Sequence, residues 1–227
     1  MATHFNENHS ISSIANTTDA VTAALQSDKQ TESLASLWQG LTDRADTLEF
    51  DRRLLNREVR RARARVCVCD GLWDETTAAF GRATVDESGG RRDQPPYTRF
   101  FNKVPPHKVQ TFGVKREIDL GRTWLSELAR NPSEPLAVTW IPRIKDATDQ
   151  LEAAVEARAN AVKALGLHQT SEILFTDDVN KEIDILEGEL KKVFAGASGR
   201  ADSFLAATRP ARRRRSAARD SETGQEG

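Results

Sequence analysis

The most regular pattern in the chain is a run of apolar residues between Leu34 and Phe80 that recur every three or four positions. This spacing keeps apolar side chains on one side of an α-helix, and the alternation of three and four is typical of coiled-coil helices. Only Arg52 and one threonine interrupt the run, and no proline lies within it. The pattern predicts one helix over residues 31–84, roughly 80 Å long, with Gly71 as the place where a bend is expected.

Shorter helical patterns follow in the second half of the chain. They predict helices over residues 106–130, 134–165 and 177–195. Gly166 is expected to end the second of these, because glycine commonly closes a helix. Thr176 is expected to cap the start of the third, since its hydroxyl can accept a hydrogen bond from a free backbone N–H.

Three segments lack a strong periodic pattern. Residues 1–30 are predicted to be a polar N-terminal arm, either frayed or forming a short helix. Residues 85–105 are predicted to be a loop rich in glycine and proline, and residues 196–227 a disordered basic tail. The bundle proper is expected over residues 31–195. The predicted fold class is all-α: an elongated antiparallel helical bundle, held together as an intramolecular or dimeric coiled coil built on the one long heptad helix.

Composition agrees with narrow apolar stripes on mostly wet helices. Of 227 residues, 38% are hydrophobic and 30% charged, which argues against a thick multilayer core. The formal net charge of -1 gives the whole molecule no electrostatic preference for nucleic acid or membrane. No apolar run is long enough to span a bilayer, and the first residues do not resemble a signal peptide. A cytoplasmic location is therefore expected.

The sequence shows no pattern that points to catalysis. Cys67 and Cys69 are two residues apart, so on a helix they face different directions and neither bridge each other nor share a metal. We expect reduced thiols, with an intersubunit disulfide as the alternative. No zinc, phosphate-loop or nucleophile motif occurs. The expectation is a protein that is not an enzyme and has no catalytic residues, no cofactor and no metal. The four tryptophans are expected to fill the core.

An aromatic cluster lies in the predicted loop. Tyr97, Phe100 and Phe101 fall within five residues of one another, between glycine and proline pairs. A solvated linker rarely carries three aromatic side chains so close together. They are candidates for binding a protein partner, although docking of the loop onto the protein's own bundle is the favoured interpretation.

Arginines gather at two places. Arg53, Arg57 and Arg60 share the outward face of the long helix, where they are candidates for contacting a polyanion. The favoured alternative is a solvated face paired with the acidic last helix. The second cluster is the run Arg212, Arg213, Arg214 and Arg215. It is either an electrostatic arm, through which weak polyanion binding is expected, or a solubilising terminus.

These patterns support three hypotheses for function. The leading one is a non-enzymatic helical interaction or scaffold protein that acts through coiled-coil packing with a protein partner or with a second copy. The alternative is a nucleic-acid-associated protein that uses the arginine-rich helix face and the basic tail. A third is an enzyme or ligand carrier with a pocket between helices, closed by the loop over residues 86–106.

Overall fold

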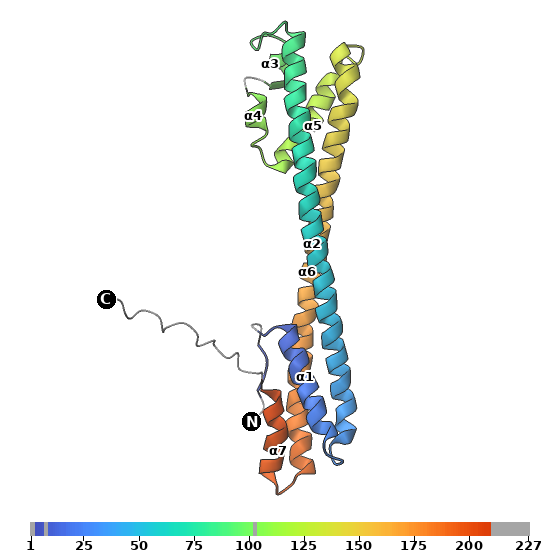
Figure 1. The fold of residues 1–227 in the computed structure, drawn as a ribbon, viewed down its shortest axis with the longest axis vertical. Helices are drawn as coiled ribbons and strands as arrows, with labels where there is room; N and C mark the ends of the chain where they lie inside the picture. The colour runs from blue at the N-terminus through green and yellow to red at the C-terminus, as the bar shows by residue number, and fades with distance from the viewer. Residues whose placement is uncertain (1–2, 7–8, 102–103, 210–227) are drawn as a thin grey trace, which may run out of the picture. The chain divides into compact units, whose positions relative to one another are not determined.

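The computed structural model describes residues 3–6, 9–101 and 104–209. Within these ranges the chain forms seven α-helices and one short 3-10 helix, with no β-strand (Figure 1). The prediction of an all-α helical bundle is confirmed. The chain divides into two compact units: residues 1–52 and 168–227 make unit 1, and residues 53–167 make unit 2. No helix in the described part has both the length and the apolar character needed to cross a membrane.

Two long helices contribute to both units. α2 covers Glu32–Glu87 and α6 covers Pro135–Val193. Within each unit, apolar residues of α2 and of α6 belong to the same core. α2 confirms the long helix expected over residues 31–84, and it continues through Gly71 without interruption. The heptad pattern was therefore a reliable guide to this element.

α6 corrects the expectation of two separate helices over residues 134–165 and 177–195. Gly166 lies inside the helix and is not among the glycines with positive φ. The Thr176 hydroxyl does not cap a helix start; it donates to the carbonyl oxygen of Glu172 at 2.9 Å, as threonine does inside a helix. A glycine closes a helix when it adopts the left-handed conformation. Gly196 does so, with φ +85, and follows the end of α6 as predicted.

Unit 1 adds α1 (Ile11–Gln26) to the long helices, so of the two expectations for the N-terminal arm over residues 1–30, a frayed arm or a short helix, the helix is the one that forms. Ser10 caps α1 by accepting from the backbone N–H of Ser13. Thr18 and Thr22 are buried, and their hydroxyls donate to backbone carbonyls three and four residues earlier. Threonines that satisfy their own hydroxyls can occupy a buried face, which is why α1 looked polar in the sequence.

The segment after Gly196 also corrects a prediction. α7 covers Ser198–Leu205 and is followed by the 3-10 helix η1 over Ala206–Thr208. Phe204 and Leu205 are buried in the core of unit 1, where Phe204 stacks on Phe194. The disordered tail predicted for residues 196–227 therefore does not include residues 198–208. Residues 210–227 lie outside the described part of the chain.

Unit 2 adds three short helices between the long ones: α3 (Tyr97–Phe101), α4 (Pro106–Val109) and α5 (Val114–Leu128). The single helix expected over residues 106–130 is broken, because Gly113 is extended and caps the start of α5. All four tryptophans of the chain are buried, as predicted. Trp124 of α5 stacks on Trp73 of α2 with ring centroids 5.8 Å apart. This stacking helps to hold α5 on α2.

Candidate interaction surface

The aromatic cluster lies inside unit 2. Tyr97, Phe100 and Phe101 are all buried on α3, in the same core as Phe80 and Trp124. The rings of Phe80 and Phe100 meet edge to face at 4.9 Å, and the indole N–H of Trp124 donates to the carbonyl oxygen of Phe100 at 3.0 Å. The loop docks onto the protein's own bundle, and these three side chains are not presented to a partner in this structure.

The arginines of α2 are on the surface of unit 2. Arg53, Arg57 and Arg60 are exposed, at the positions opposite to the buried Val59 and Val66. Three further arginines of the same segment, at positions 61, 63 and 65, are exposed as well. The segment from residue 53 to residue 65 thus carries six arginines and a single acidic residue, Glu58. It is the most basic stretch of the described chain.

Few carboxylates neutralise this basic segment. Glu58 pairs with Arg61 at 2.6 Å, one turn along the same helix. Among the described residues, no carboxylate lies within ion-pair distance of the arginines at positions 57, 60, 63 and 65. Acidic residues of the last helical segment have other partners: Asp178 pairs with Arg44, and Glu189 pairs with Lys192.

Exposed aliphatic side chains lie along the same part of α2. Leu54 is 40% exposed, Val68 64% and Leu72 44%. With the arginines they form a continuous stripe at steps of three and four residues, which we call the outer stripe. It consists of Leu54, Arg57, Arg61, Arg65, Val68 and Leu72. At about 100° per residue these positions share one side of the helix, separate from the buried heptad seam. The part of α2 in unit 2 therefore has two stripes. One is the apolar seam buried in the core, and the other is the outer stripe of aliphatic residues and arginines, which faces solvent.

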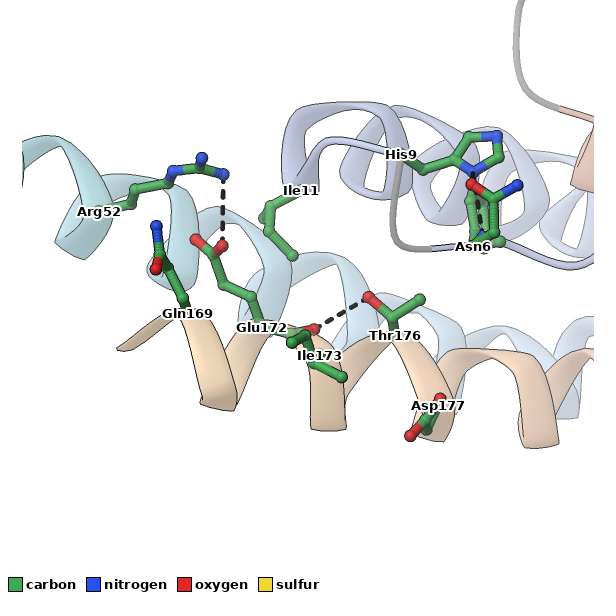
Figure 2. Close-up of a pocket in the computed structure, with 10 residues that line it drawn as sticks. Asn6, His9, Ile11, Arg52, Gln169, Glu172, Ile173, Thr176 and Asp177 are labelled. Atoms are coloured by element: carbon green, nitrogen blue, oxygen red, sulfur yellow. Dashed lines mark hydrogen bonds and ion pairs between the residues drawn. The ribbon is translucent and has the colours of Figure 1, made fainter. Parts of the chain in front are cut away.

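A cleft of about 760 Å³ in unit 1 lies beside an ion pair (Figure 2). The guanidinium of Arg52 is 3.3 Å from Glu172, whose other carboxylate oxygen is 3.3 Å from the Nε2 of His168. The same Nε2 also approaches the carbonyl oxygen of Leu48 at 3.0 Å. Glu172 is thus held between two basic groups, which explains how the apolar run of α2 accommodates Arg52.

A cluster of acidic side chains is buried in unit 2. Glu117 of α5 is only 1% exposed and lies beside Asp70 of α2. Burial first, and then the nearby carboxyl groups of Asp70 and Asp74, together raise the pKa of Glu117 to about 8. Burial, with a smaller contribution from the charge of Asp70, also raises the pKa of Asp74. The sequence analysis did not identify this cluster.

A signal for the buried cluster was nevertheless in the sequence. Glu117 lies four residues before Gly121 and seven before Trp124, both of which are buried with Leu128 on one side of α5. Instead of a row of bulky aliphatic residues, the buried side of α5 combines a glutamate, a glycine and a tryptophan with Leu128. The other predicted polyanion-binding residues, Arg212, Arg213, Arg214 and Arg215, lie outside the described part of the chain.

Both cysteines are free thiols, Cys67 exposed and Cys69 buried. No group of three or more histidine, cysteine, aspartate or glutamate side chains in the described ranges is placed to hold a metal ion. Comparison with protein-family models, with curated proteins and with solved structures found no match to this chain. The argument for function therefore rests on the surface itself.

Proposed function

We propose that this chain is a non-enzymatic helical interaction protein that binds a partner helix along the outer stripe of α2. The observation that carries the proposal is the outer stripe, in which three arginines at helical spacing are flanked by the exposed Leu54 at one end and by the exposed Val68 and Leu72 at the other. Exposed apolar side chains that follow one face of a helix are typical of a contact surface. The complementary partner is an amphipathic helix with carboxylates beside its apolar seam.

The two kinds of side chain contribute differently to such a complex. Full burial of a leucine or valine is worth about 1.5–3 kcal/mol, and Leu54, Val68 and Leu72 each have roughly half of that available. An exposed ion pair contributes about 0–1 kcal/mol. The aliphatic residues therefore supply most of the affinity. Arg57, Arg61 and Arg65 favour an acidic partner and orient it, because guanidinium groups bind carboxylates through paired hydrogen bonds.

The test compares two charged substitutions on unit 2. The variant Val68→Glu/Leu72→Glu places carboxylates in the outer stripe, while Val138→Glu places one at an exposed site of α6 outside it. Both variants should keep the helical circular dichroism of the wild type. A partner captured from native extract, identified and purified, should bind the wild type and the Val138→Glu chain. Its affinity for the stripe variant should fall at least tenfold, since the apolar contact is lost.

Solution mass distinguishes a foreign partner from a second copy. If the wild type alone is a dimer and the stripe variant is a monomer, the partner helix belongs to another copy of this chain. A stripe variant that binds all partners as the wild type does, with unchanged mass, would contradict the proposal.

The arginine segment supports a second candidate function, binding of nucleic acid through its phosphates. Six exposed arginines with one glutamate over thirteen residues form a positive patch of the kind that contacts a phosphate backbone. This candidate needs the arginines and not the aliphatic residues. Binding to a random-sequence DNA duplex should weaken steeply with salt, should be lost in Arg57→Glu/Arg60→Glu, and should persist in Val68→Glu/Leu72→Glu.

The contribution of the basic tail is tested by truncation. A chain that ends at Arg209 removes the arginine run and keeps α7, whose Phe204 and Leu205 are part of the unit 1 core. Loss of duplex binding on truncation would assign it to the tail. Retained binding would assign it to α2.

A further inference from the structure

Glu117 of α5 is a buried carboxyl group beside a second acidic side chain, Asp70 of α2. An ionised carboxylate only accepts hydrogen bonds, so a hydrogen bond between these two groups forms only when one of them carries a proton. Glu117 is almost completely removed from solvent, and its Oε2 has no hydrogen-bond partner within the described part of the chain. Ionisation of Glu117 would leave a buried negative charge beside a second carboxylate.

No cation compensates this cluster. Asp70 and Asp74 face Glu117 from α2, and both are acidic. From α6, Asp149 and Glu152 approach α5 as well, but their partner is Arg122 on another side of the helix. Across the described residues, no lysine or arginine lies within ion-pair distance of Asp70, Asp74 or Glu117. Apart from the partial positive charge at the start of α5, a proton is thus the only positive charge that the described surroundings of Glu117 provide for.

We infer that the carboxyl pair of Asp70 and Glu117 is a proton-binding site, and that its proton keeps α5 docked on α2 within unit 2. The pair joins the first turn of α5 to α2, two turns before Trp124 on α5 and one turn before Trp73 on α2. When the proton leaves, the buried Glu117 carries a negative charge beside a second carboxylate. Separation of α5 from α2 relieves that repulsion by letting solvent reach Glu117. The site makes the packing of unit 2 sensitive to pH.

The direction of the pH effect follows from the folded and unfolded states. In the unfolded chain Glu117 ionises near its ordinary pKa of about 4.3, whereas in the folded chain the pKa is about 8. Between these values the folded chain holds one proton more than the unfolded chain. Stability from this site therefore decreases as pH rises, by about tenfold in the folding equilibrium constant for each pH unit, and the decrease ends above pH 8.

The experiment follows the side-chain carboxyl resonances of the wild type by carbon-13 NMR. The Glu117 resonance should titrate with a midpoint near pH 8. Near-ultraviolet circular dichroism of the Trp73–Trp124 stack should weaken over the same pH range, because it reports the docking of α5. A Glu117 midpoint close to the ordinary carboxyl value, or a high midpoint at Asp74 in its place, would overturn the assignment.

Two glutamate-to-glutamine variants provide the matched comparison. Glu117→Gln keeps the shape of the side chain and donates its amide to an ionised Asp70, so its tryptophan signal should be constant from pH 6 to about pH 9. Glu152→Gln, at the exposed ion pair with Arg122, should keep the wild-type profile. A profile that stays pH-dependent in the Glu117→Gln chain would show that another group titrates. The carboxyl titration of the wild type decides the question even if the Glu117→Gln chain fails to fold.

Discussion

At the scale of single residues, the packing of α5 depends on the lack of a side chain at Gly121. Gly121 and Thr148 of α6 are both buried, and a Cβ built on Gly121 would overlap the Thr148 hydroxyl. Gly71 of α2 is the opposite case, because a Cβ there meets open space. Both glycines are helical and neither has a positive φ. Sequence alone could not distinguish them, since the difference lies in the neighbouring helix.

This contrast predicts opposite effects of the same substitution. Gly121→Ala should destabilise the chain by about 1–3 kcal/mol, because Thr148 must move in a close-packed core. Gly71→Ala should stabilise it by about 0.5–1 kcal/mol, because alanine favours the helix and nothing obstructs its methyl group. Urea unfolding of the two variants beside the wild type measures both. Equal shifts in the same direction would show that the contact between α5 and α6 is looser than described.

At the scale of elements, the sequence was informative where one apolar stripe dominates a helix. α2 was predicted to within three residues at either end because its heptads are long and uninterrupted. α7 was missed, and α1 was only one of two alternatives, because each contributes only a few large apolar residues, which become a core only when placed against α2 and α6. The division of α6 at Gly166 was wrong for a related reason. A glycine or threonine has a local preference, and the packing of the flanking turns overrides it.

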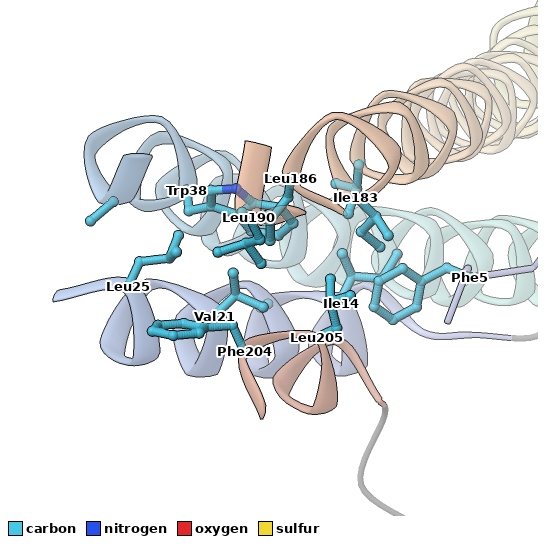
Figure 3. Close-up of a cluster of buried hydrophobic side chains, with 14 of the residues drawn as sticks. Phe5, Ile14, Val21, Leu25, Trp38, Ile183, Leu186, Leu190, Phe204 and Leu205 are labelled. Atoms are coloured by element: carbon cyan, nitrogen blue, oxygen red, sulfur yellow. The ribbon is translucent and has the colours of Figure 1, made fainter. Parts of the chain in front are cut away.

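The core of unit 1 provides a test of the role of α1. Figure 3 shows Ile14 and Val21 on the side of α1 that faces Ile183 and Leu190 of α6. Ile14→Ala should cost about 2–4 kcal/mol, since it leaves a cavity in a fully buried site. The matched change Ile173→Ala removes a half-exposed side chain from α6 and should change stability by less than about 0.5 kcal/mol. Thermal unfolding of both variants beside the wild type measures these effects. If both melting temperatures were equally close to that of the wild type, the packing of α1 described here would be contradicted.

At the scale of the whole molecule, two separate cores share two continuous helices. One core is built from α1, α7 and the unit 1 parts of α2 and α6, and the other from α3, α4, α5 and the unit 2 parts. The all-α class and the long helix followed from periodicity. The division into two units did not, because it depends on which short helices cover which part of α2. The outer stripe could not be predicted from the sequence either. Its aliphatic residues can be recognised as exposed only once the residues of the buried seam are known.

Because the chain has two separate cores, a destabilising substitution in one core should leave the stability of the other core unchanged. Proteins open in cooperative parts whose stabilities differ, and amide hydrogen exchange measures each part separately. Ile14→Ala should raise exchange in α1 and α7 and leave α3 and α5 at their wild-type rates. Gly121→Ala should do the reverse, raising exchange in α3 and α5 while α1 and α7 keep their protection. The pair controls for overall destabilisation, because each variant serves as the other's reference at one pH and temperature. If either substitution accelerated exchange equally in all the short helices, the continuous backbones of α2 and α6 would couple the two cores into one cooperative unit, and the outer stripe would then lie on a helix whose stability depends on both.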